Sequence, residues 1–110
     1  MNSPVLINPF HIYVRNPNPH DDDLESVILG ACLTETTAMV LVGDKLSPEM
    51  FYETKFGEIY AALLSMYHSG KAIDLVTVRA ELASRGKLEA VGGAYELVRL
   101  AGAWRLPPIW

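Results

Sequence analysis

The sequence predicts an all-α protein: a small orthogonal bundle of about five to six helices with an extended N-terminal arm. Three observations support this prediction. Apolar residues recur every three or four positions in successive segments, helix-capping residues and glycines separate those segments, and alternation typical of strands occurs only in the arm. The length of 110 residues and a hydrophobic content of 50% suit one domain with a single core.

Residues 1–19 form the predicted arm, which contains four of the seven prolines and three Asn-Pro pairs. Proline fixes φ and forces the preceding residue out of the helical region, so no helix is expected there. The arm also carries apolar residues that need cover from this domain or a neighbour: Val5, Leu6, Ile7, Phe10, Ile12, Tyr13 and Val14. We expect a helical domain over residues 20–102 and a C-terminal tail over residues 103–110.

The first helix is expected to begin at the three aspartates of residues 21–23, which suit a helix N-terminus. Its predicted buried stripe is Leu24, Val27, Ile28, Ala31 and Cys32. A short helix over residues 36–42 should follow and end before Gly43.

Ser47-Pro48-Glu49 has the residue order of a helix start, with serine as the cap and Met50 and Phe51 directed inward. The longest helix is predicted over residues 54–68. Its apolar stripe consists of Phe56, Ile59, Tyr60, Leu63 and Tyr67.

Asp74 is the expected cap of the next helix, whose buried stripe is Leu75, Val78 and Leu82 and which ends at Gly86. A turn over residues 87–93 leads to a last helix with Tyr95, Leu97, Val98, Leu100 and Ala101. The predicted core comprises Val27, Ile28, Ile59, Leu63, Val78, Leu82 and Leu97.

The sequence offers no catalytic, nucleotide-binding or metal site and calls for no cofactor. No phosphate-binding P-loop pattern occurs, and His11, His20 and His68 lack metal-ligand spacing. Cys32 falls on the predicted buried stripe, where a small core role is favoured over a nucleophile. The aspartates at 21–23 suit capping better than Ca²⁺ binding.

Two other patterns have alternative interpretations. Gly92-Gly93 before a helix permits anion binding, although a tight turn is favoured. The aromatic residues of the long helix permit base stacking, although a core role is favoured because basic neighbours are few. The net charge of −4 argues against direct binding of nucleic acid, and no segment is long and apolar enough for a membrane span.

Four segments in order resemble one known family. They are Leu24-Glu25-Ser26-Val27-Ile28-Leu29-Gly30-Ala31 after Pro19-His20; Leu46-Ser47-Pro48-Glu49-x-Phe51-Tyr52 with Ile59-Tyr60-x-Ala62; Gly70-x-x-Ile73-Asp74-Leu75-Val76-Thr77-Val78; and Leu82-x-x-x-Gly86-x-Leu88-x-x-Val91-Gly92-Gly93-x-Tyr95-x-Leu97. Together they resemble the N-terminal domain of the DnaB-type bacterial replicative DNA helicases. Phe56 departs from the family's usual His or Asn.

The resemblance implies a non-catalytic protein-interaction domain that acts in helicase ring assembly and primosome contacts during DNA replication in the cytoplasm. The family's ATPase domain lies beyond the segment that matches, so this chain is not expected to be an enzyme. A stand-alone adaptor that binds a helicase, loader or primase is the alternative. Expected partners are a second copy of the chain, a helicase ATPase domain, a primase or a loader, with no direct nucleic acid and no membrane.

Apolar residues at both ends of the chain are the predicted self-association residues. They are Phe10, Ile12 and Tyr13 in the arm and Trp104, Ile109 and Trp110 in the tail. A bundle this small has few grooves to cover both sets, and Trp and Tyr are favoured interface anchors. The alternative is that one or both ends fold back onto their own domain.

Overall fold

The computed structural model describes residues 21–105, and side chains within residues 24–103. This part of the chain consists of helices joined by short loops and has no strand, which confirms the predicted all-α class. The helical elements are α2 (Asp21–Thr34), α3 (Ala38–Val42), the 3-10 turn η2 (Pro48–Met50), α4 (Thr54–His68), α5 (Leu75–Ser84) and α6 (Gly93–Arg105). The predicted arm, residues 1–19, lies outside the described residues.

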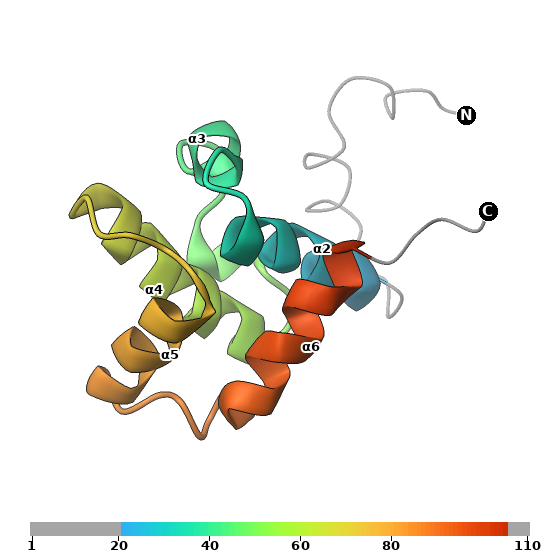
Figure 1. Cartoon of the computed structure of the whole chain (residues 1–110). Coiled ribbons are helices and arrows are strands. Elements are labelled where there is room, and N and C mark those ends of the chain that lie inside the picture. Colours follow the sequence, from blue (N-terminus) through green and yellow to red (C-terminus); the bar gives the residue numbers. More distant parts are fainter. Residues whose placement is uncertain (1–20, 106–110) are drawn as a thin grey trace.

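The helices form one bundle in which α2 and α4 each contact several other elements, as Figure 1 shows. The first and last helices, α2 and α6, lie side by side, and α4 contacts α2, α3, α5 and η2. This arrangement places the middle of α4 in the core, while α3 lies at the edge of the bundle.

The predicted bounds of α4 are confirmed, because it spans Thr54–His68 and buries Phe56, Ile59, Tyr60 and Leu63. The hydroxyl of Tyr60 donates a hydrogen bond to the Val42 carbonyl at 3.2 Å, which ties α4 to the end of α3. Six of the seven predicted core residues are buried: Ile28, Ile59, Leu63, Val78, Leu82 and Leu97.

The prediction for the seventh, Val27, is wrong, since its side chain is 36% exposed whereas Ile28 is 6% exposed. The reason is that α2 packs against both α6 and α4. Its buried face is therefore centred on Glu25, Leu29 and Leu33, one residue away from the predicted stripe. Leu24, like Val27, lies at the border of this face and is exposed.

Two further expectations need correction. The short helix begins at Ala38, not at residue 36. The predicted helix start at Ser47 is a single 3-10 turn in which the serine side chain makes no capping hydrogen bond and Met50 is exposed, although Phe51 is buried as predicted. In α6, Leu97 and Leu100 are buried, whereas Tyr95 is exposed.

Asp74 caps α5 as predicted. Its Oδ1 accepts a hydrogen bond from the Thr77 backbone N–H at 2.9 Å, and Thr77 Oγ1 accepts one from the Asp74 N–H at 2.8 Å. This reciprocal pair is a capping box, which satisfies two backbone donors that the helix itself leaves unpaired. The last helix, α6, continues past Gly102 to Arg105.

The Gly92-Gly93 turn before α6 requires glycine at both positions, with φ of +106° and +75°. A Cβ at Gly92 would also lie 2.9 Å from Cβ of the buried Glu96, whereas a Cβ at Gly93 would meet nothing within 4 Å. Gly92 and Gly93 therefore both have a positive φ, but only Gly92 lacks space for a Cβ atom.

We expect Gly92→Ala to lower the free energy of unfolding by about 2–3 kcal/mol, and Gly93→Ala by about 1–2 kcal/mol. The first substitution adds a steric overlap with Glu96 to the cost of a left-handed alanine. Denaturant unfolding of the two variants measures the difference. Equal losses would mean that the overlap is relieved without cost.

Candidate docking surfaces

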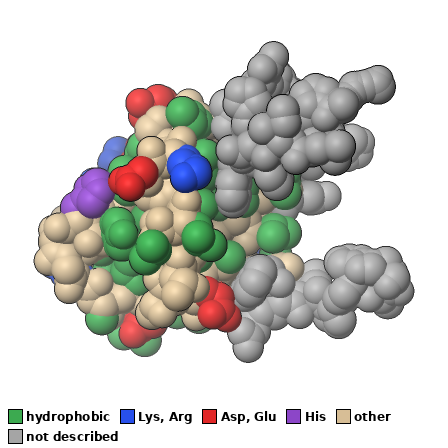
Figure 2. Space-filling view, turned by 90° about the horizontal axis from the view of Figure 1, so that it is seen from above, with side chains coloured by type: hydrophobic (Ala, Val, Ile, Leu, Met, Phe, Trp, Pro, Cys, Tyr) green, Lys and Arg blue, Asp and Glu red, His purple; other side chains and the backbone are tan. Residues whose placement is uncertain are grey.

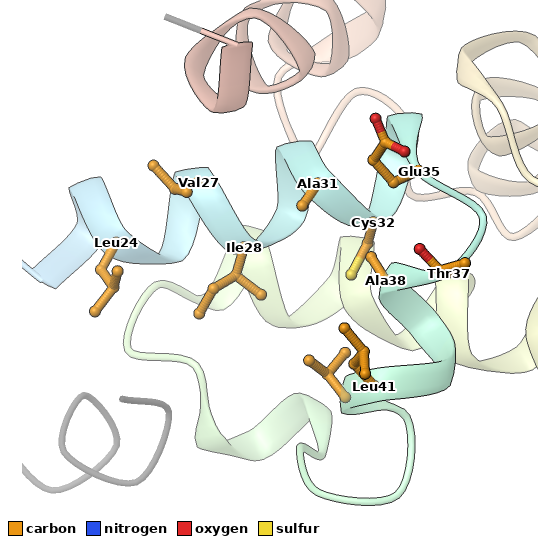
Figure 3. Close-up of a pocket in the computed structure, with 10 residues that line it drawn as sticks. Leu24, Val27, Ile28, Ala31, Cys32, Glu35, Thr37, Ala38 and Leu41 are labelled. Atoms are coloured by element: carbon orange, nitrogen blue, oxygen red, sulfur yellow. The ribbon is translucent and has the colours of Figure 1, made fainter. Parts of the chain in front are cut away.

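An open groove lies between α2 and α3 and has a volume of about 590 Å³. Its lining is apolar except at one end, where Glu35 and Thr37 lie. The lining residues are Leu24, Val27, Ile28, Ala31, Cys32, Glu35, Thr37, Ala38, Leu41 and Val42. Figure 3 shows Leu24 and Ile28 on α2 pointing into the space bordered by Leu41 of α3. We call this feature the α2–α3 groove.

The groove exists because α3 is short. With five residues, α3 buries only Met39 and Val42, and Leu41 remains 66% exposed. Such a helix covers little of its neighbour, so Leu24 and Val27 remain accessible. Leu24 and Val27, which were predicted to be buried, therefore line an open groove instead.

The Cys32 thiol forms part of the wall of the groove and is buried. Burial raises the pKa of this thiol to about 12, because the thiolate would lose its hydration. The thiol therefore stays protonated near neutral pH and acts as a small apolar group, as the sequence indicated.

A second apolar surface lies where α5 meets α6. A shallow hollow of about 130 Å³ there is lined by Leu75, Val76, Arg79, Ala94, Leu97 and Val98. Val76 and Val98 are exposed beside it, and Tyr95 is exposed on the same helix as Val98. We call this feature the α5–α6 surface. It is smaller than the groove and carries a cation, Arg79, where the groove carries Glu35.

Glu25 is a fully buried carboxylate that joins α2 to the start of α4. It accepts hydrogen bonds from the backbone N–H groups of Tyr52 and Glu53, the latter at 3.3 Å. Glu53 is the N-cap residue of α4, and its own side chain makes no capping hydrogen bond. Glu25 therefore supplies, from another helix, acceptors for donors at the start of α4.

Sequence reasoning assigned no role to Glu25. A usable signal was present, since Glu25 stands three and four residues before the buried Ile28 and Leu29. That spacing places the carboxylate on the apolar face of α2. An acidic residue in such a position needs hydrogen-bond donors from another element.

Burial raises the pKa of Glu25 above its ordinary value of 4.5 and outweighs the two backbone hydrogen bonds, which lower it. The folded chain therefore holds this proton more tightly than the unfolded chain. The resulting contribution to stability is complete below pH 4.5 and is lost as the pH rises through the raised pKa.

We expect the stability difference between the native chain and Glu25→Gln to shrink as the pH rises above 4.5, the ordinary value above which the pKa of Glu25 is raised. The reason is that glutamine does not titrate. Urea unfolding of both proteins from below to above that pH measures the difference. A difference that grows with pH would mean that the hydrogen bonds outweigh burial and lower the pKa.

Charges on the described surface occur mostly as local pairs. The largest cluster surrounds Glu96, which binds Arg99 Nη2 at 2.6 Å and lies 3.4 Å from Lys55 Nζ. The Arg99 hydrogen bond is the main reason that the pKa of Glu96 lies below its ordinary value.

The face in Figure 2 shows acidic, basic and apolar side chains interspersed. It carries no broad basic field of the kind that nucleic acid binding requires.

The structure places only part of the predicted self-association set. Phe10, Ile12, Tyr13, Ile109 and Trp110 lie outside the described residues. Trp104 is in the last turn of α6, where the backbone alone is described. The sequence did not predict the two apolar surfaces as sites. It placed Leu24 and Val27 on the buried stripe of the first helix and assigned no surface role to Tyr95 or Val98.

Two kinds of feature are absent from the described residues. No group of three or more His, Cys, Asp or Glu side chains within residues 24–103 is arranged to hold a metal ion. Among the described helices, none combines the length and the apolar character needed to cross a bilayer.

Relatives of this chain are replicative helicases. It is 39% identical over 85 residues to the replicative DNA helicase DnaB of Geobacillus stearothermophilus. It is 36% identical over 85 residues to the replicative DNA helicase DnaC of Bacillus subtilis (strain 168). Each match covers 77% of this chain but 19% of the relative, so the chain spans about a fifth of those proteins.

A solved structure and a family model agree with these matches. The crystal structure of the N-terminal domain of DnaB helicase from Mycobacterium tuberculosis superposes with a TM-score of 0.72 at 36% identity. That superposition covers 77% of this chain and 58% of the other. Residues 17–107 match the family model described as the DnaB-like helicase N-terminal domain. The chain therefore belongs to the family of DnaB-like helicase N-terminal domains.

Proposed function

We propose that this domain is a non-catalytic protein-interaction module that acts in assembly of a replicative helicase ring and in primosome contacts. The observation that carries the proposal is the open, almost wholly apolar α2–α3 groove on a domain of this family. Apolar surface that a domain leaves uncovered favours contact with another protein. Self-association is the first interaction that we assign to it.

The terminal segments supply the other half of this contact. Phe10, Ile12 and Tyr13 in the arm, and Trp104, Ile109 and Trp110 in the tail, are the proposed self-association residues. Aromatic anchors of this kind carry much of the binding energy at protein interfaces.

We expect the full chain to sediment as a dimer or larger species, and Phe10→Ser with Ile12→Ser to weaken association about 30-fold, the equivalent of ~2 kcal/mol. The matched control is Asn8→Ser with Asn16→Ser, which changes the same arm without removing apolar surface. Analytical ultracentrifugation at tens of micromolar compares them. A monomeric native chain would contradict the proposal. Equal association of all three proteins would move the interface away from the arm.

The α5–α6 surface supports a second candidate function, that of an adaptor for a helicase, loader or primase. Its exposed Val76, Tyr95 and Val98 lie on elements separate from the groove, so a different partner has room to bind. Val98→Ser would reduce adaptor binding while leaving self-association through the groove unchanged.

A further inference from the structure

Building on the adaptor function, we propose that the α5–α6 surface binds an acidic, apolar segment of another protein. An Asp or Glu side chain of that segment pairs with Arg79. Apolar side chains of the same segment cover Val76, Tyr95 and Val98. The basis of the proposal is a single cation that stands among exposed apolar side chains on two adjacent helices.

The apolar part of the surface comes from both helices. In α5, Val76 lies two positions before the buried Val78 and therefore on the opposite side of the helix. In α6, Tyr95 and Val98 are three positions apart and share one face. All three of these side chains are more than half exposed. A partner that removes them from water gains hydrophobic free energy, and tyrosine is a favoured anchor at such contacts.

Arg79 is the charged residue in the lining of the hollow. No ion pair to Arg79 occurs among the side chains of residues 24–103. The carboxylates of α5 and α6, Glu81 and Glu96, are bound by other cations. Those cations are Lys71 and Arg85 at Glu81, and Lys55 and Arg99 at Glu96.

A partner that covers this surface removes water from the Arg79 guanidinium. A charged group that loses its hydration must be paired, because an unpaired charge at an interface costs binding free energy. A carboxylate suits a guanidinium best, since the two groups form a pair of parallel hydrogen bonds. A Lys or Arg at the same place in the partner would be repelled. The covering segment is therefore expected to carry an Asp or Glu among apolar residues.

The terminal segments of this chain lack that chemistry. Residues 1–20 and 103–110 contain no Asp or Glu. They supply the apolar residues proposed for self-association, whereas Arg79 calls for a negative charge. The α5–α6 surface therefore suits a different protein, and its binding remains separate from self-association through the α2–α3 groove.

Selection of peptides on the full-length chain tests the proposal. A phage library of random dodecapeptides is selected on the immobilised chain, and the Kd of the strongest binder is measured by fluorescence anisotropy. Arg79→Ala removes the cation, and Val98→Ser removes apolar contact. Lys45→Ala is the matched control, because Lys45 is also exposed, has no ion pair among the described side chains and lies outside the hollow.

We expect the selected peptides to be enriched in Asp or Glu beside Leu, Ile, Val or Phe, compared with the unselected library. Arg79→Ala and Val98→Ser should each weaken binding about 10-fold, whereas Lys45→Ala should leave it unchanged. Arg79→Glu should bind a version of the peptide with Lys in place of its acidic residue more tightly than the original peptide. This reversal distinguishes a charge contact from damage to the fold.

Selected peptides without acidic enrichment, binding that Arg79→Ala leaves unchanged, or a selection without binders would each overturn the proposal. Binding that is lost in Val27→Ser but not in Val98→Ser would move the peptides to the α2–α3 groove and would also overturn it, although the chain would remain an interaction module.

Sedimentation of the same variants tests a second copy as the occupant. If Arg79→Glu weakens self-association, the surface contacts another copy of the chain, and the proposal is overturned while self-association is retained. A monomeric native chain that binds acidic peptides through Arg79 would support the proposal and contradict self-association.

Discussion

Leu63→Ala is expected to lower the free energy of unfolding by about 2–5 kcal/mol. Leu63 is fully buried in the middle of α4, a helix that contacts α2, α3, α5 and the turn η2. Its truncation removes apolar contacts and leaves a cavity that rigid neighbouring helices fill only in part. Domains of this kind are typically stable by ~5–15 kcal/mol, so the loss is a large fraction of the total.

Leu41→Ala is the matched control, because it is the same chemical change at a residue that is 66% exposed on α3. Its cost should stay within about 0.5 kcal/mol. Urea unfolding at protein concentrations low enough to keep the chain monomeric separates this effect from any role of Leu41 in association. Similar losses for the two variants would show that the centre of the core lies elsewhere.

The elements of the fold could be predicted because their signals are local. Periodicity gave the bounds of α4, the Asp74 cap indicated the start of α5, and Gly86 indicated its end. Each depends on residues within a few positions of one another. In α5 the two buried residues, Val78 and Leu82, are four positions apart and lie on one stripe of the helix, as predicted.

The docking surfaces could not be predicted in the same way. Leu24 and Val27 have the spacing of buried residues, but α2 packs its other face against α6 and α4, and the short α3 leaves these two side chains uncovered. Whether a partner helix reaches far enough depends on the arrangement of the whole bundle. Glu25 presents the same difficulty, since its donors at Tyr52 and Glu53 are 27 and 28 residues away.

Glu25→Ala should lower the free energy of unfolding by about 2–4 kcal/mol. The substitution leaves the N–H groups of Tyr52 and Glu53 without their acceptors, and each unpaired donor costs ~1–3 kcal/mol. Removal of a buried carboxylate offsets part of this loss, because the native chain bears the cost of burying that group.

Glu53→Ala provides the control, because it removes the same side chain from the N-cap position, where that side chain makes no capping hydrogen bond. Its cost should remain below ~1 kcal/mol. Glu25→Gln retains one acceptor oxygen and should fall between the two. Denaturant unfolding gives the ranking, and amide hydrogen exchange at Tyr52 and Glu53 tests its cause, because both amides should exchange faster in Glu25→Ala. If Glu25→Ala and Glu53→Ala cost the same, the link between α2 and α4 does not depend on this carboxylate.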